Sequence, residues 1–406
     1  AILRDTEPEL HLRSVTLTAK DKICLCETRE CTPEACPYAN GYYARIKGAL
    51  WDVLDVPCLT AETLQEYAKR HTVCPFELGL DSSLWSDVII GDYNYLFDPV
   101  VHLVRFFESA GDYIFLVDEA HNLPGRAREM HSAALTKTSF YEAKKLLGKG
   151  KSSLKNALTK VNDVFIEWRH RAEEETAARD GRFGKTFFLK ERSEEFDHLL
   201  NRLCEPLEAW LDDHREPDET HTALLQLYFD VRAWLRVADT FDDHFVLQIT
   251  ASGSEVRAAQ LCLDPSAFLA DSFALGRAAV LFSATLAPAS YYKDLCGVPE
   301  ARAVALRSPF PAGNQGLFCI GNVSTRYKDR DASLAIVEES LATMVRARCG
   351  NYLAFFPSYA YMEQAYAQFK EHCPEINCIK QENAMDEQQK AVSYTHLRAH
   401  ETDSYL

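Results

Sequence analysis

The stretch Tyr113–Gly125, YIFLVDEAHNLPG, decides the fold class of this chain. Its apolar half predicts a buried β-strand, and Asp118 and Glu119 follow at the carboxyl end of that strand, where open parallel sheets bind their ligands. One carboxylate there can hold Mg²⁺ on nucleotide phosphates, while the other orients or deprotonates a water molecule. His121 can link this site to a neighbouring domain. An acidic helix N-cap is the simpler alternative, and the complete D-E-A-H order argues against it.

A second stretch, AAVLFSATL at 278–286, repeats the pattern of a buried strand followed by polar residues. Ser283 and Thr285 are small hydroxyl residues that can hydrogen-bond the acid-pair loop and report the state of the nucleotide. Alone, they would equally suit an ordinary turn or helix cap. The order D-E-A-H and then S-A-T favours the functional interpretation.

Further continuous apolar runs predict strands of a parallel sheet covered on both faces. They are SDVIIGDYNYLF at 86–97, GLFCIGN at 316–322 and NYLAFFPS at 351–358. Helical stretches such as SLAIVEESLATMVRA alternate with them, which predicts a doubly wound α/β architecture. Residues from about 136 to 250 instead predict an inserted helical domain, packed around Trp168, Trp210 and Trp234.

Composition sets broad limits on the 406-residue chain. Its length suggests about two to four domains. The sequence contains no apolar run long enough for a transmembrane helix, and its first residues lack the apolar core of a signal peptide. We therefore expect a cytoplasmic location and no membrane partner. The net charge of −16 argues against a surface covered with phosphate contacts, although a local basic stripe is enough for nucleic acid.

Six of the thirteen cysteines lie between Cys24 and Cys74. Without a secretion signal, such clustering favours metal over disulfides. The spacing lacks the tight C-x2-C pairs of a zinc ribbon and is compatible with four thiolates around a [4Fe–4S] cluster. The candidate ligands are Cys24, Cys31, Cys36 and Cys74. Cys26 is an alternative to Cys24, Cys58 suits a loop or core position, and spacing alone does not exclude zinc.

Two stretches imitate a phosphate-binding loop, GKGKSS around Lys151 and GRFGKTFF around Lys185. The signature G-x-x-x-x-G-K-[ST] would place its first glycine at Lys145 or Arg179, and it must follow a strand and open a helix. We reject both stretches. We expect the loop to lie upstream of Ala1 in a longer protein.

The order of cysteine block, D-E-A-H, helical insert and S-A-T resembles the XPD/DinG-like iron–sulfur DNA helicases of superfamily 2, most closely a bacterial branch. The resemblance runs from about residue 13 to about residue 390 and rests on KIC…C…CPYA, VCPFE, IIGDYNYLFDP, LVDEAHNL, LFSATL, SPF and FFPS. It implies an ATP-driven translocase that unwinds DNA, typically 5′ to 3′, in repair or replication. It also implies ATP and Mg²⁺ as cofactors, and single-stranded and forked DNA as substrates.

By the same resemblance, Asp118 and Glu119 are the Walker B acids of a RecA-like P-loop motor domain, and His121 completes the box. Ser283 and Thr285 couple ATP to DNA. The four cysteines hold the cluster, and the insert is an arch domain. The implied domains are the end of a first motor segment (1–21), a cluster domain (22–80), motor domain 1 (81–135 and 251–306), the insert (136–250), a partial motor domain 2 (307–390) and an anomalous tail (391–406).

Two departures from the family pattern limit what we expect of the chain. The phosphate loop is missing, and the second motor domain ends before the motifs that carry γ-phosphate arginines. We therefore expect a fragment that does not hydrolyse ATP alone. A helicase-like nuclease, and a zinc- or Fe–S-stapled nucleic-acid-binding module with a decayed ATPase, are the rival interpretations.

Contacts to DNA are harder to place in the sequence. The run 137–171 carries nine Lys or Arg against three acids, which suits phosphate contacts or simply a solvated helix face. Tyr93, Tyr95 and Phe97 can stack on bases, but we favour a core role for them.

Overall fold

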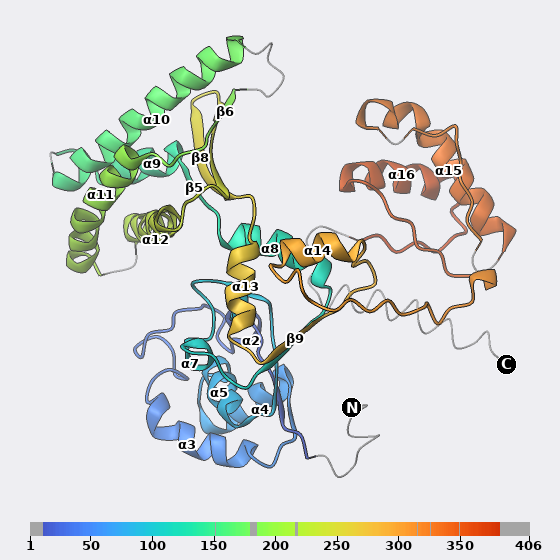
Figure 1. The fold of residues 1–406 in the computed structure, drawn as a ribbon, viewed down its shortest axis with the longest axis horizontal. Coiled ribbons are helices and arrows are strands. Elements are labelled where there is room, and N and C mark those ends of the chain that lie inside the picture. The colour runs from blue at the N-terminus through green and yellow to red at the C-terminus, as the bar shows by residue number, and fades with distance from the viewer. Residues whose placement is uncertain are drawn as a thin grey trace. The chain divides into compact units, whose positions relative to one another are not determined.

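The computed structural model describes residues 11–150, 152–178, 185–215, 218–314, 316–324, 326–348 and 350–381. The chain divides into two compact units that meet between residues 304 and 305. The first unit contains two small parallel sheets, a cysteine-rich helical region and a separate insert (Figure 1). The predicted tail at 391–406 lies outside the described residues.

Parallel strands form where the sequence predicts them. Strands β1 (Ser14–Thr16), β2 (Cys58–Leu59) and β3 (Val88–Ile90) form one sheet in the order β2-β1-β3. Strands β4 (Ile114–Val117) and β9 (Ala278–Leu281) form a separate parallel pair. These sheets confirm the α/β class and the three expected strands at VII, IFLV and AAVL.

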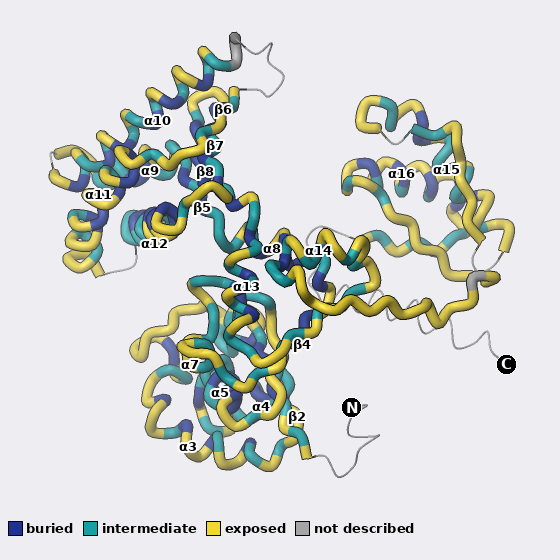
Figure 2. Tube along the Cα trace, in the orientation of Figure 1, coloured by how far each residue is buried: buried dark blue, intermediate teal, exposed yellow. Residues whose placement is uncertain are grey.

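The expected burial of these strands on both faces is wrong. In the β4–β9 pair, Phe115 and Leu281 face a hydrophobic core, whereas Leu116 is 69% exposed and Val280 is 51% exposed on the opposite face. All three residues of β3 are also exposed; Figure 2 gives the burial of the chain residue by residue. The reason is that, within the described residues, the core packed on the β4–β9 pair contacts only one face of it, the face of Phe115 and Leu281.

Four helices build the cysteine-rich region against β1. They are α2 (Lys20–Ile23), α3 (Tyr42–Val53), α4 (Ala61–His71) and α5 (Pro75–Ser82). Their apolar faces share one core with Val15 of the strand. Helix α4 begins where the Thr60 hydroxyl accepts a hydrogen bond from the Thr63 N–H, a standard N-cap.

Short helices surround the β4–β9 pair and hold its ends. They are α6 (Asn94–Phe97), α7 (Val104–Phe107), α8 (Leu123–Met130), α13 (Ser266–Ala274) and α14 (Ala289–Leu295), with the 3₁₀ turn η2 (Ala120–Asn122). A further 3₁₀ turn, η1 (Ser83–Trp85), follows α5 in the cysteine-rich region. Phe97 of α6 is buried and meets Phe273 of α13 edge to face, with ring centroids 5.4 Å apart. This contact joins segments far apart in sequence beneath the strand ends.

The insert contains a sheet as well as helices, which corrects the helical expectation. Its elements are β5 (Ala133–Thr136), α9 (Lys137–Leu146), α10 (Ser153–Ala178), β6 (Thr186–Leu189), α11 (Glu194–Asp213), α12 (Glu219–Asp239), β7 (Phe245–Ser252) and β8 (Glu255–Cys262). The strands are antiparallel in the order β5-β8-β7-β6. The expected boundary at residue 250 falls inside β7. The alternating burial of β7 shows the period of two that marks a half-buried strand.

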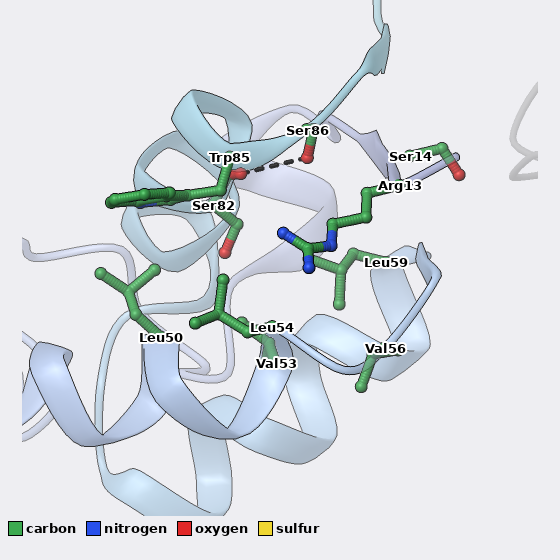
Figure 3. A pocket seen from close by; sticks show the side chains of 10 residues that line it. All are labelled: Arg13, Ser14, Leu50, Val53, Leu54, Val56, Leu59, Ser82, Trp85 and Ser86. Atoms are coloured by element: carbon green, nitrogen blue, oxygen red, sulfur yellow. Dashed lines mark hydrogen bonds between the residues drawn. The ribbon is translucent and has the colours of Figure 1, made fainter. Parts of the chain in front are cut away.

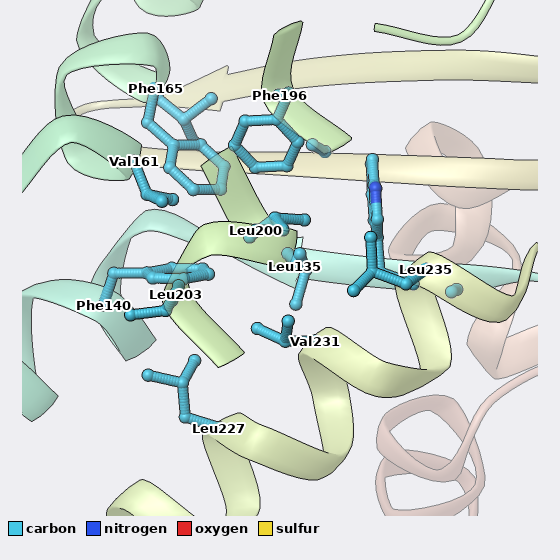
Figure 4. Packing of buried hydrophobic residues seen from close by; sticks show 14 of the residues in the cluster. Leu135, Phe140, Val161, Phe165, Phe196, Leu200, Leu203, Leu227, Val231 and Leu235 are labelled. Carbon is cyan, nitrogen blue, oxygen red and sulfur yellow. The ribbon is translucent and has the colours of Figure 1, made fainter. Parts of the chain in front are cut away.

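One hydrophobic core holds the insert together (Figure 4). Trp234 is fully buried and Trp168 nearly so, while Trp210 packs at the edge of the same core. The expected role of these tryptophans as packing anchors is confirmed. Side chains of Ser193 and Asp218 cap the first turns of α11 and α12, so the chain marks where each of these helices begins.

The second unit is helical where it is described. Helix α15 (Arg330–Ala347) confirms the expected helix, and α16 (Tyr359–His372) packs against it; two 3₁₀ turns, η3 (Ala312–Asn314) and η4 (Tyr327–Asp329), precede them. The strands expected at GLFCIGN and NYLAFFPS are not formed in the described part of this unit. Phe318 there is 91% exposed, because an extended segment becomes a strand only when a neighbour satisfies its backbone groups. No helix among the residues described is long and apolar enough to cross a membrane.

Candidate functional site

The acid pair lies at the edge where two parallel strands end together. Val117 of β4 is in register with Leu281 of β9. Beyond the strands, the Phe282 N–H donates to the Val117 carbonyl at 3.0 Å, and the Ala120 N–H donates to the Phe282 carbonyl at 3.1 Å. The D-E-A-H and S-A-T segments, 162 residues apart, are therefore held side by side by backbone hydrogen bonds.

A side-chain network joins the two segments. The Ser283 hydroxyl donates to Glu119 Oε2 at 3.1 Å. His121 Nδ1 lies 2.8 Å from the same hydroxyl oxygen and 3.2 Å from Glu119 Oε2. Because the single Ser283 proton goes to Glu119, the Nδ1 atom must carry a proton and donate, an assignment made from the network. The structure thus brings three predicted site residues into mutual contact.

Thr285 and Asp118 complete this arrangement. The Thr285 N–H donates to Ser283 Oγ at 3.1 Å, and its hydroxyl oxygen lies 3.3 Å from that atom. Asp118 Oδ1 accepts a hydrogen bond of 2.8 Å from the N–H of Glu119. Both acids are exposed at this edge, so their carboxylates are accessible to a hydrated cation, and carboxylates are common ligands of Mg²⁺.

Glu119 has an unusual backbone. Its φ of 45° and ψ of 41° lie in the left-handed region, which is uncommon for a residue with a Cβ and costs free energy. The hydroxyl of Tyr93 donates to the carbonyl oxygens of Asp118 and of Glu119. Burial and the two neighbouring carboxylates raise the pKa of Tyr93, burial being the larger cause, so the phenol keeps its proton.

The four predicted cluster ligands surround one cavity of about 200 Å³. Cys24, Cys31, Cys36 and Cys74 all line it, together with Cys26. The cysteines come from three places: the end of α2, the loop before α3 and the start of α5. Sequence positions up to fifty residues apart thus converge on one space.

Within the cavity wall, the thiols lie at different depths. Cys36 is buried and Cys31 is exposed. Cys26 Sγ lies 3.8 Å from Cys36 Sγ; burial, then Cys36 and Cys24, raise the pKa of Cys26 to about 11. Burial also raises the pKa of Cys74, which caps α5, although backbone N–H groups of that helix counteract it.

The cavity is lined by thiols, the donor type that holds both structural zinc and iron–sulfur clusters, and it has space for either. Among the residues described, no group of three or more His, Cys, Asp or Glu is spaced to hold one metal ion. The cluster itself therefore remains a prediction.

The two rejected phosphate-loop candidates both lie in the insert. Gly150 is in the loop between helices α9 and α10, so no strand precedes it; Lys151 lies outside the described residues, as does Gly184. Lys185 comes directly before strand β6 and pairs with Glu173 at 2.9 Å. Neither position has the strand-to-helix turn that cradles phosphates.

The residues considered for DNA contact divide into two groups. Phe97 is buried, and Tyr93 and Tyr95 pack against two different cores, which confirms their core role. Part of the basic run is already engaged within the insert: Lys155 donates to the Gly148 carbonyl at 2.5 Å. A role for this run on DNA stays a prediction.

A second, smaller hollow of about 10 Å³ lies between α3, β2 and η1 (Figure 3). Arg13, Leu59 and Trp85 are among its lining residues. It has room for about one water molecule. We assign it no function.

Sequence reasoning missed two features of the site. It treated Tyr93 only as a stacking or core residue, although a tyrosine in a core usually needs a partner for its hydroxyl. It also treated Cys26 as a substitute ligand, whereas the structure places it beside Cys36 in the same cavity.

Comparison with known proteins adds independent support for the fold. The DEAD_2 family profile matches residues 9–140. The XPD helicase subunit of Schizosaccharomyces pombe is 24% identical over 383 residues, covering 77% of this chain and 49% of the relative. XPD/RAD3 of Saccharomyces cerevisiae is 23% identical over 421 residues, covering 85% and 53%. A regulator of telomere elongation helicase 1 homolog from Anopheles gambiae is 28% identical over 139 residues, covering 31% and 14%.

A solved structure titled XPD_Helicase matches with a TM-score of 0.50 and 18% identity, covering 98% of this chain and 68% of that one. The match shows a shared fold. The chain spans about half or less of the length of the curated relatives named above. These relatives are eukaryotic, so the expected bacterial branch stays a prediction.

Proposed function

We propose that this chain belongs to an ATP-dependent DNA helicase of the XPD type and carries part of its motor together with its cysteine-rich and inserted domains. One observation carries the proposal: Glu119, Ser283 and His121 are bonded to one another at the common end of two parallel strands. A motor needs such a link, because the acid that handles the attacking water must sense the segment that responds to DNA.

The roles follow from the contacts. Asp118 and Glu119 bind the Mg²⁺–nucleotide, with Glu119 orienting the water for attack. Ser283 donates a hydrogen bond to Glu119 and accepts one from the Thr285 N–H. A shift of Glu119 would therefore move the S-A-T segment as well. His121 donates to the Ser283 hydroxyl, lies 3.2 Å from Glu119 Oε2 and fixes the geometry between these two residues. The cycle of nucleotide binding and hydrolysis is proposed to drive translocation on single-stranded DNA, in the 5′ to 3′ direction that the resemblance to XPD-type helicases implies.

The cysteine cavity supports a [4Fe–4S] cluster held by Cys24, Cys31, Cys36 and Cys74. When bound, the cluster would supply iron–thiolate bonds that fasten three chain segments together: the end of α2, the loop before α3 and the start of α5. The protein contributes the packing around it: Tyr42 lines the cavity and donates a hydrogen bond of 2.8 Å to Asp81 on α5. That bond holds α3 and α5 together beside the cavity.

The insert, acting as an arch, and the cysteine-rich region are proposed to hold single-stranded and forked DNA. The basic run on α9 and α10 supplies phosphate contacts whose strength falls with salt. The acidic net charge of the whole chain does not oppose this arrangement, because binding depends on the local potential.

The test is DNA-stimulated ATP hydrolysis by the protein expressed from the complete open reading frame that encodes this chain. Glu119→Gln removes the proposed water-orienting carboxylate, and we expect it to abolish hydrolysis. Asp112→Asn is the matched control, because Asp112 is an exposed acid at the other end of β4, paired with Arg277. Equal activity of Glu119→Gln and the wild type would refute the assignment.

The rival is a metal-stapled nucleic-acid-binding module with a decayed ATPase. It is favoured by one observation, the five thiols around the cysteine cavity, which a purely structural metal site would also use. The same experiment decides between them: a wild-type protein that binds single-stranded DNA without hydrolysing ATP supports the rival. Iron, sulfide and zinc analysis after anaerobic purification identifies the metal.

A further inference from the structure

Tyr93 makes contacts that the proposed function does not use. Its hydroxyl is directed at the backbone of the acid pair, where it donates to the carbonyl of Asp118 and also approaches the carbonyl of Glu119, at 3.1 Å. A phenol has one proton, so the two carbonyls share it. The bond therefore constrains two successive peptide groups and not a single side chain.

These are the peptide groups on either side of Glu119, whose backbone is in the left-handed region. A residue with a Cβ leaves that conformation readily unless neighbouring contacts hold it there. The Glu119 side chain meets Ser283 and His121 from this backbone conformation. Whatever fixes the two carbonyls also fixes the direction of the carboxylate.

Tyr93 is itself firmly placed. Its ring meets Phe97 edge to face, with centroids 6.4 Å apart, and Phe97 is buried against Phe273 of α13. The next residue, Asn94, accepts a hydrogen bond of 3.4 Å from Arg126 of α8. The short helix α6 thus contacts α8, which directly follows the acid-pair loop, and α13, which precedes β9.

We propose that Tyr93 is a positioning residue, whose hydroxyl holds the backbone of Asp118 and Glu119 so that the Glu119 carboxylate stays directed at Ser283 and His121. The reaction that it serves rests on the proposed function. The clamp on the loop is a property of the fold and can be tested without any ATPase activity.

Tyr93→Phe removes the hydroxyl and keeps the ring. Tyr95→Phe is the matched control, because it makes the same chemical change two residues away, where the ring packs against the other core. The first readout is hydrogen–deuterium exchange in this chain, followed at the amides of Glu119 and Ala120. These amides donate to Asp118 Oδ1 and to the Phe282 carbonyl.

We expect exchange at these amides to accelerate by about twofold to tenfold in Tyr93→Phe, the effect of losing one neutral hydrogen bond. Exchange in strands β7 and β8 of the insert serves as an internal reference and should stay unchanged. Tyr95→Phe should leave the loop amides as in the wild type. If the exchange rate of these amides in Tyr93→Phe equals that of the wild type, or rises equally in both variants, the hydroxyl of Tyr93 does not hold the loop and the proposal is wrong.

The second readout is steady-state ATP hydrolysis by the complete open reading frame. We expect Tyr93→Phe to lower kcat by a similar factor and to raise the Mg²⁺ concentration for half-maximal rate, with KM for DNA unchanged. A loss of folded protein would lower the rate at every Mg²⁺ concentration and would leave the concentration for half-maximal rate unchanged. If the loop loosens while kcat and the Mg²⁺ requirement stay constant, the positioning role is wrong. A wild type without hydrolysis refutes the proposed function, and the exchange result still decides the clamp.

Discussion

Replacing Ser283 with alanine should disconnect the acid pair from the S-A-T segment. The Ser283 hydroxyl donates to Glu119 and accepts from His121 and from the Thr285 N–H. Alanine removes all three bonds. The backbone bonds between Phe282, Val117 and Ala120 do not involve this side chain, so the strand pair should persist and the fold should stay intact.

The size of the effect follows from the kind of bond that is lost. A hydrogen bond to a charged group contributes about 1.5–3 kcal/mol, but the Glu119 side chain is 59% exposed and water replaces part of the loss. We expect a net loss of about 1–2 kcal/mol in transition-state stabilisation. At about 1.4 kcal/mol per tenfold change, kcat for DNA-stimulated hydrolysis should fall about 5- to 30-fold.

The matched variant is Thr285→Ala. It keeps the backbone N–H that donates to Ser283 and loses only a hydroxyl contact of 3.3 Å. A neutral contact of this kind contributes about 0.5–1 kcal/mol, which corresponds to a two- to fivefold loss. Both variants are assayed for ATP hydrolysis with saturating single-stranded DNA, for displacement of a forked duplex, and for thermal unfolding.

The ranking of the two variants tests the reasoning. Wild-type hydrolysis in Ser283→Ala, or a larger loss in Thr285→Ala, would show that the network does not transmit the position of Glu119. A lower unfolding temperature in Ser283→Ala alone would instead indicate a structural role for the hydroxyl.

Three further predictions concern the cavity and the insert. Burial raises the pKa of Asp197 in the folded state. Because the unfolded chain ionises this carboxyl more readily, the free energy of unfolding falls as the pH rises above about 3.9, the ordinary pKa of an aspartate. Asp197→Asn keeps an acceptor for the Trp234 N–H, which donates at 2.8 Å. The unfolding temperature of the variant minus that of the wild type should increase as the pH is raised from about 4 to about 7. A difference that does not change with pH would contradict this. Cys36→Ser should lose bound iron and sulfide and abolish unwinding, whereas Cys58→Ser, an exposed cysteine outside the cavity, should retain both; iron analysis and strand displacement decide, and intact unwinding by Cys36→Ser sinks the ligand role. Phe165→Ala should cost the insert about 3–5 kcal/mol in urea unfolding, because Phe165 is fully buried; a loss below about 1 kcal/mol would be inconsistent with the packing.

The sequence predicted the strands next to the site because their apolar runs end abruptly in polar residues. Residues 114–117 and 278–281 form strands, and the pairing of Asp118 and Glu119 with Ser283 follows from strands that end at the same edge. The buried tryptophans of the insert could also be predicted, because large apolar residues in an amphipathic helical pattern belong to a core.

The predictions that were wrong concern segments whose structure depends on neighbours elsewhere in the chain. Phe318 and Phe355 lie in runs with strand composition, yet both are exposed outside any strand, because strand formation needs a paired partner. The antiparallel sheet of the insert was overlooked because its strands lie among long helical stretches. The contact of Tyr93 with the acid pair is long-range, 25 residues in sequence, and no local pattern encodes it.

The way the insert is attached has a mechanical consequence. The chain enters it through β5 and leaves it through β8, and these two strands are hydrogen-bonded neighbours, with Ala133 paired to Gln260. Just outside them, Ser132 accepts from the Cys262 N–H, and Arg128 donates to the Leu263 carbonyl. Two adjacent strands joined by hydrogen bonds in this way move together and not as two independent crossings of the chain. A load applied to the insert would therefore reach α8, and with it the acid-pair loop, through one double-stranded connection.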